Sequence, residues 1–204
     1  MNKKEYFLSV FKLAEKKYGE HDKRLAGDDW PHAWQTLIAT IMSAQTRDEV
    51  TIPVAEGLFA RYTSLDKLAH ARENDVLNII KRVNFSKTKA KNVIGAARYL
   101  VEHYDSHVPD TIDALVNLPG VGRKTANLVL SEVHKQDGIT VDTHVHRIAN
   151  VFGFVTTKTP TQTEFALRKL VPSRYWSRIN RIFVLWGKDV RGYDKKKFLA
   201  KLKE

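Results

Sequence analysis

Apolar residues recur along the chain at the spacing of amphipathic α-helices. The i, i+3, i+4, i+7 pattern is seen first at Phe7, Val10, Phe11 and Ala14. The same spacing returns in the segments 34–42, 93–101, 129–133, 145–151, 165–170 and 179–186. Strand-like alternation is short and scarce, and its best example, 138–141, is better interpreted as an extended connector. The pattern therefore predicts an all-α fold of about ten or eleven short helices.

The segment 187–204 is highly charged but keeps an apolar edge. It contains seven Lys or Arg residues and three Asp or Glu residues, and Phe198, Leu199 and Leu202 recur at helical spacing. We therefore expect this segment to form a helix that docks on the fold rather than a loose tail.

The composition is typical of a folded, soluble protein. Of the 204 residues, 43% are hydrophobic and 28% are charged. No apolar run approaches the roughly 20 residues of a membrane-spanning helix. Charged residues interrupt the segment 1–20, so we expect no secretory signal and a cytoplasmic location. The chain has no cysteine, which excludes disulfides, Cys-ligated zinc, iron–sulfur clusters and thiol nucleophiles.

The net charge indicates a polyanionic partner. Lys and Arg number 34 against 23 Asp and Glu, which gives a formal charge of +11. Nucleic acid is the commonest polyanion that proteins of this charge bind. Charge alone also fits a basic protein without such a partner.

The segment 112–134 has the pattern of two helices joined by a glycine turn. A short helix, 112–117, is followed by the turn LPGVG at 118–122, after which a second helix begins. The proline ends the first helix, and the two glycines permit positive φ and leave room for a ligand. Unpaired N–H groups and the cations of Arg123 and Lys124 open the second helix. This arrangement favours an anion such as a DNA phosphate, although an ordinary helical hairpin has the same outline.

This hairpin resembles the helix-hairpin-helix motif of the endonuclease III (HhH-GPD) superfamily of DNA glycosylases. The segment 39–48, ATIMSAQTRD, is similar to the family segment that ends in S-A-Q-x-x-D. The segment 89–94, KAKNVI, is similar to the family helix start K-A-x-N-I, and 141–149, VDTHVHRIA, matches V-D-T-H-x-x-R. With these four motifs in the family's order, the chain is identified as an endonuclease III-like member over about residues 30–190.

Lys124 and Asp142 are the residues that could perform the chemistry. Base removal breaks the bond to C1′ through a positively charged sugar, which a carboxylate stabilises. An amine that attacks C1′ gives an imine, and the imine permits β-elimination. On residue chemistry alone, the alternatives are a phosphate contact for Lys124, which residue chemistry favours, and a helix N-cap for Asp142.

The resemblance assigns catalytic roles to the same two positions. In the family, a lysine two residues after the second hairpin glycine is the Schiff-base nucleophile, and the aspartate of V-D-T-H assists base removal. The resemblance therefore implies a base excision repair DNA glycosylase with AP lyase activity that uses Lys124 and Asp142. Relatives that lack the lyase step have another residue at the lysine position.

Chemistry at C1′ requires that the nucleotide leave the duplex, so protein side chains must fill the gap. The resemblance places Gln45 of S-A-Q and Phe85, just before the K-A-x-N helix, in this role. The alternatives are a polar residue at a helix end for Gln45 and core packing for Phe85. The second loop departs from the family, because Asn84 replaces the usual glycine and Ser86 a common tyrosine.

We expect further DNA contacts from the hairpin and from the V-D-T-H helix. The residues are Gly120, Gly122, Arg123, Thr125 and His144. His144 and His146 point in different directions on a helix, so no metal is expected there. Typical family members hold a [4Fe–4S] cluster with four cysteines after the position of Gly187. This chain has none, so the resemblance is to clusterless relatives and no iron–sulfur cofactor is expected.

The expected architecture has two helical lobes. One is the bundle 26–136 with the hairpin 112–134, and the other combines 1–25 with 137–204. Lys124 and Asp142 are expected to face each other across a cleft. The expected partner of the monomer is double-stranded DNA with a damaged or mismatched base or an abasic site. In the family, the base that is usually excised is an oxidised pyrimidine. Three alternative functions stay open: a glycosylase for thymine or uracil mismatches, a glycosylase without lyase activity, and a non-catalytic hairpin DNA-binding protein.

Overall fold

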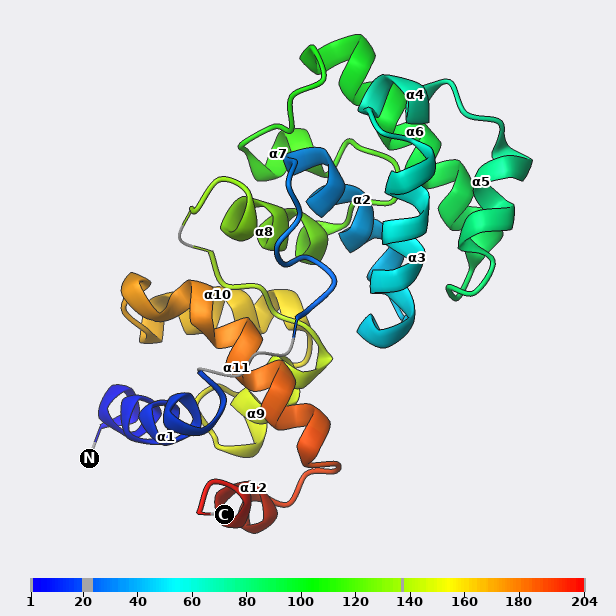
Figure 1. Ribbon diagram of the computed structural model, residues 1–204. Helices are drawn as coiled ribbons and strands as arrows, with labels where there is room; N and C mark the ends of the chain where they lie inside the picture. The colour runs from blue at the N-terminus through cyan, green and yellow to red at the C-terminus, as the bar shows by residue number, and fades with distance from the viewer. Residues whose placement is uncertain (1, 20–23, 137, 204) are drawn as a thin grey trace. The chain divides into compact units, whose positions relative to one another are not determined.

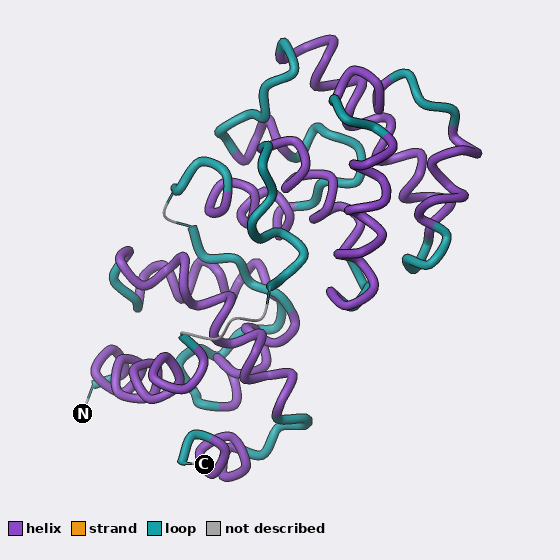
Figure 2. Tube along the Cα trace, viewed as in Figure 1, coloured by secondary structure: helices purple, strands orange, loops and turns teal. Residues whose placement is uncertain are grey.

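The computed structural model describes residues 2–19, 24–136 and 138–203 (Figures 1 and 2). Within these ranges it contains twelve α-helices, one short 3-10 helix and no strand, so the predicted all-α fold is confirmed. The chain divides into two compact units, Lys23–Lys135 and the combination of Met1–Asp22 with Gln136–Glu204. Each unit has its own buried core.

Among the described residues, seven consecutive helices form one unit, and helices from both ends of the chain form the other. Unit Lys23–Lys135 contains α2 (Ala33–Ser43), α3 (Asp48–Arg61), α4 (Leu65–Ala69), α5 (Glu73–Ile80), α6 (Ser86–Tyr104), α7 (Ile112–Leu115) and α8 (Arg123–Glu132). The other unit contains α1 (Lys3–Tyr18), α9 (Thr143–Val151), α10 (Pro160–Leu170), η1 (Ser173–Tyr175), α11 (Trp176–Asp189) and α12 (Lys195–Lys201). The prediction of ten or eleven helices was low because helices as short as α4 do not complete an apolar repeat.

Helix α2 is the centre of the unit Lys23–Lys135. It packs against α3, α6 and α8, and every residue from Gln35 to Met42 is buried. A helix that is buried on all sides is typical of a core position. Because α8 packs on α2, the core of this unit fixes the second helix of the predicted hairpin.

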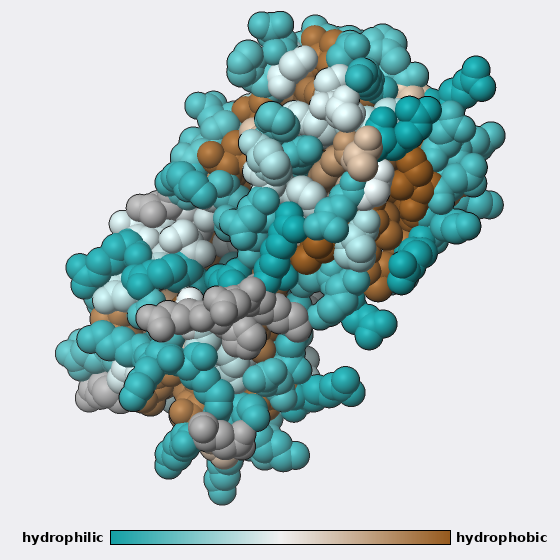
Figure 3. All heavy atoms as spheres, in the orientation of Figure 1, coloured by the Kyte–Doolittle hydropathy of each residue, from teal (hydrophilic) through white to brown (hydrophobic). Residues whose placement is uncertain are grey.

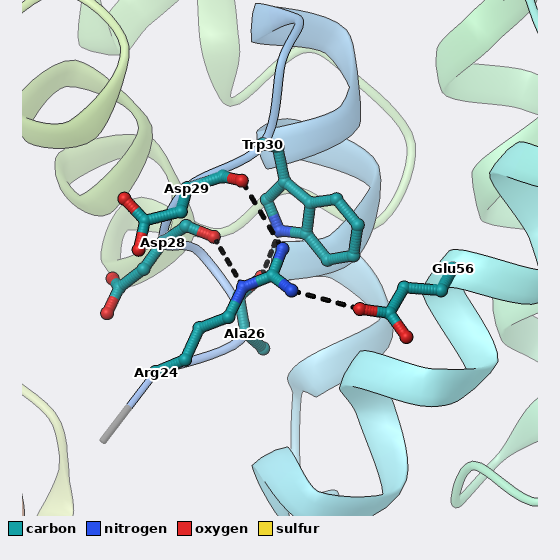
Figure 4. A network of polar contacts seen from close by, with 6 residues as sticks. All are labelled: Arg24, Ala26, Asp28, Asp29, Trp30 and Glu56. Atoms are coloured by element: carbon teal, nitrogen blue, oxygen red, sulfur yellow. Dashed lines mark hydrogen bonds and ion pairs between the residues drawn. The ribbon is translucent and has the colours of Figure 1, made fainter. Parts of the chain in front are cut away.

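Arg24 ties the start of this unit to α3 (Figure 4). Its guanidinium lies 4.2 Å from the centre of the Trp30 ring and 3.0 Å from the Glu56 carboxylate of α3. It also donates hydrogen bonds to the carbonyl oxygens of Asp28, at 3.1 Å, and Asp29, at 3.4 Å. The planar guanidinium thus holds an irregular segment through several directed contacts at once.

The other unit has an aromatic core. Phe7 and Phe11 of α1 pack against Phe183 of α11, with ring centres 6.3 Å and 6.1 Å apart. Phe198 of α12 is fully buried, and its ring centre lies 5.2 Å from that of Trp186. The predicted docking of the segment 187–204 is therefore confirmed for α12.

The surface in Figure 3 is largely hydrophilic, with apolar side chains in separate patches. Among the described helices, none combines the length and the apolar character needed to cross a membrane. Residues 138–141 form a connector without regular secondary structure, so no strand is present there, as the sequence predicts.

Candidate functional site

The glycine turn between α7 and α8 is the predicted hairpin. Gly120 has φ +78°, and a Cβ there would lie 2.8 Å from Asn92 Cβ on α6, so both the backbone and the packing require glycine. Gly122 differs from the prediction, because its φ of −93° is open to any residue. A Cβ at Gly122 would meet nothing within 4 Å. Glycine at this position therefore leaves open space beside the start of α8.

The first turn of α8 presents three of the predicted site residues. Gly122 is the N-cap of α8 and supplies no side-chain hydrogen bond to the first N–H groups. Lys124 is exposed, Arg123 is half-buried and Thr125 is only 8% exposed. Lys124 is therefore exposed enough to reach a ligand, whereas Thr125 is almost fully covered.

Asp142 is the N-cap of α9. Its Oδ1 accepts a hydrogen bond from the Val145 N–H at 2.8 Å, and the residue is half-buried. The capping role predicted for Asp142 is therefore confirmed. Because a carboxylate has two oxygens and several lone pairs, capping through one of them is compatible with a second role.

His144 and His146 contact different neighbours, as their spacing predicts. His146 Nδ1 lies 2.7 Å from Thr163 Oγ1, which fixes this ring inside its unit. His144 is half-buried beside Gly187, where a Cβ would lie 2.8 Å from His144 Cβ. Burial lowers the pKa of His144 below 6.5, although the charge of Asp142 opposes the shift. The described residues include no group of three His, Cys, Asp or Glu side chains placed to hold a metal ion.

Gln45 and Phe85 lie in two exposed loops of the unit Lys23–Lys135. Phe85 is 64% exposed, so core packing, the alternative for this residue, is wrong. Gln45 is also exposed and follows the end of α2 by two residues. Both residues have left-handed backbones, with φ +55° at Gln45 and +58° at Phe85. Non-glycine residues adopt this conformation rarely, and their surroundings must hold them there.

Lys89 is a buried residue of this region whose role the sequence analysis missed. Its Nζ donates hydrogen bonds to the carbonyl oxygens of Met42 and Ala44, both at 2.6 Å, and to Thr46 Oγ1 at 2.9 Å. Burial lowers the pKa of Lys89 from 10.5 to about 8. Its position offered a signal, because Lys89 lies four residues before Val93 on the buried face of α6, where a lysine is unusual.

Comparisons with known proteins decide the family. The model of the HhH-GPD superfamily of base excision DNA repair proteins matches residues 38–173. The chain belongs to the HhH-GPD superfamily. It is similar to the endonuclease III of Thermotoga maritima, with 43% identity over 157 residues, 77% of this chain and 74% of the relative. It is also similar to the endonuclease III of Synechocystis, with 38% identity over 163 residues, 79% of this chain and 74% of that relative.

A solved structure supports the same HhH-GPD fold. A trapped covalent intermediate of endonuclease III with DNA matches with a TM-score of 0.86 at 26% identity, over 95% of this chain and 90% of that chain. This HhH-GPD protein is therefore a base excision repair DNA glycosylase and AP lyase, as its motifs led us to expect. Lys124, Asp142, Gln45 and Phe85 all lie within the matched residues.

Proposed function

We propose that this glycosylase excises a damaged pyrimidine through Lys124 as a Schiff-base nucleophile, with Asp142 as the assisting carboxylate. The observation that carries the proposal is the position of Lys124, which is exposed in the first turn of α8 beside the open space at Gly122. The partial positive charge of a helix N-terminus attracts the phosphates on either side of the target nucleotide. Asp142 is held in place by its hydrogen bond to α9.

The proposed reaction follows from these two side chains. Asp142 accepts a proton from the Lys124 ammonium group and passes it to the departing base, so that the carboxylate is charged again and stabilises positive charge on the sugar. The Lys124 amine bonds to C1′ as the C1′–N bond breaks, and the base leaves with that electron pair and gains a proton. The nitrogen then loses a proton, and its electron pair forms a double bond to C1′. The bond from C1′ to the ring oxygen breaks, that oxygen gains a proton, and an imine is left on Lys124. Loss of a C2′ proton then expels the 3′ phosphate, and water hydrolyses the imine to regenerate the amine.

The proposed partner of the monomer is double-stranded DNA with a damaged or mismatched base or an abasic site. The net charge of +11 and the start of α8 favour phosphate contacts. The exposure of Phe85 and Gln45 fits side chains that fill the gap left by a displaced nucleotide. Asn84 and Ser86, beside Phe85, keep thymine or uracil opposite guanine as the second candidate substrate.

A panel of duplexes that differ at one base pair tests the substrate proposal. We expect a nick at an oxidised pyrimidine and at an abasic site, and no reaction with the undamaged duplex, as measured on denaturing gels. Preferential excision of thymine or uracil opposite guanine would favour the second candidate. An intact strand at the abasic site would contradict the proposed lysine chemistry.

We propose that the protein contains no iron–sulfur cluster. Cysteine thiolates hold [4Fe–4S] clusters, and this chain has no cysteine, so its residues do not fit the cluster of typical relatives. We expect the purified protein to show no absorbance near roughly 400 nm, where such clusters absorb, and no iron in elemental analysis. A stoichiometric iron signal would contradict the proposal.

A further inference from the structure

The exposed loops that carry Gln45 and Phe85 are joined by Asn84. The Asn84 side-chain amide donates a hydrogen bond to the backbone carbonyl of Gln45, and its backbone N–H donates to Thr46 Oγ1 at 3.1 Å. Asn84 directly precedes Phe85 in the chain. One residue therefore contacts Gln45 itself and is covalently bonded to Phe85.

Lys89 supports this junction from the buried side. Its ammonium group has three N–H donors, which match the three oxygens of Met42, Ala44 and Thr46. Two of these are carbonyl oxygens at the end of α2, where a cation is favourable. The backbone N–H of Lys89 also donates to the Phe85 carbonyl at 3.0 Å. Lys89 thus fixes the first loop to the start of α6.

The backbones of Gln45 and Phe85 need support from neighbouring contacts. Gln45 and Phe85 both have positive φ, a conformation that the chain maintains only when neighbouring contacts compensate for it. Asn84 makes such a contact at Gln45, whereas a residue without a side-chain donor at position 84 could not.

We propose that Asn84 is a positioning residue that couples Gln45 and Phe85, so that the two side chains enter the duplex as one unit. This inference rests on the proposed function, in which both side chains replace a displaced nucleotide. Loops that moved independently would each have to find the inserted position. Joined loops lose that freedom before DNA binds, and preorganisation of this kind favours the productive complex.

A double-mutant cycle tests the coupling. Single-turnover excision rates at saturating enzyme are measured for Gln45→Ala, Phe85→Ala and the double variant, first with Asn84 and then with Asn84→Gly. With Asn84 present, we expect the double variant to lose less than the product of the two single losses, because the residues act as one unit. Asn84→Gly should lower the rate about fivefold, the equivalent of one net hydrogen bond, and make the two losses multiply.

Two further variants separate coupling from a merely structural role. Asn84→Asp keeps the shape of the side chain but has no N–H to donate, so we expect the same loss as for Asn84→Gly. Asn74→Gly, at another exposed asparagine of this unit in α5, should excise at the wild-type rate. A wild-type rate for Asn84→Asp, or equal multiplicative losses in both backgrounds, would overturn the proposal.

A second readout does not depend on base excision. The same double-mutant cycle is measured in the Lys124→Gln background. The probe is 2-aminopurine placed opposite an abasic site. The fluorescence of this base increases when it leaves the base stack. The coupling between Gln45 and Phe85 should again require Asn84. Wild-type cleavage at the abasic site without this coupling would overturn the inference alone. A wild-type protein that neither binds nor cleaves this duplex would overturn both the inference and the proposed function.

Discussion

Lys124→Gln is expected to abolish the covalent adduct that the wild-type protein forms with abasic DNA in the presence of borohydride. Reduction traps the imine that an attacking amine forms with C1′, and glutamine has no amine to form one. Strand cleavage at the abasic site should be lost as well. DNA binding should remain, because Gly120, Gly122 and the N–H groups that open α8 are unchanged. The adduct is measured as a shifted band on a denaturing gel, and binding by titration of labelled duplex.

Lys91→Gln is the matched control for this experiment. Lys91 is an exposed lysine of α6 in the same unit as Lys124, so its loss removes the same charge elsewhere. This control should form the adduct at the wild-type level. A normal adduct with Lys124→Gln would place the nucleophile at another residue. If the wild type forms no adduct, the chain lacks the proposed lyase chemistry.

Asp142→Asn is expected to slow the excision of an intact base by about 10²- to 10³-fold, the usual effect of removing one group that stabilises transition-state charge. Asparagine also accepts the Val145 hydrogen bond and is as good an N-cap as aspartate, so the fold should retain its stability. The loss therefore isolates the charge of the carboxylate. Single-turnover excision rates and thermal unfolding of the same sample measure the two effects.

Asp194→Asn provides the control for Asp142→Asn. Asp194 caps α12 in the same unit, and its Oδ1 accepts from the Lys196 N–H at 2.8 Å. This exchange should leave excision unchanged. Cleavage at a preformed abasic site should suffer less from Asp142→Asn than excision does, because the base has already left. An excision rate within a few-fold of the wild type would contradict the proposed role of Asp142.

The fold and the hairpin could be predicted because local patterns determine them. Apolar spacing specifies each long helix, and the turn at Gly120 needs a positive φ that glycine adopts readily. The prediction of a positive φ was wrong at Gly122. Its backbone is open to any residue, and the absence of a side chain leaves space beside the start of α8. Apolar spacing predicts each helix separately. It does not predict which residues of distant segments contact one another.

The contacts of Asn84 and Lys89 join distant segments of this sort. Asn84 bonds to Gln45 across 39 positions of the chain, and Lys89 bonds to Met42 across 47. Only the packing of α6 against α2 brings these groups together. Sequence motifs therefore predicted which loops would enter the DNA, whereas the contacts that hold these loops were found only in the structure.

The aromatic core shared by α1 and α11 affects the order in which the chain can fold during synthesis. Phe11 packs against Phe183, and ribosomes add about 5–20 residues per second. The apolar face of α1 therefore waits about 10–30 s for its partner to emerge, a period in which a chaperone could cover it. The contiguous unit Lys23–Lys135 meets no such delay and can fold while synthesis continues. We therefore expect a nascent chain to fold the unit that contains Lys124 before the unit that contains Asp142.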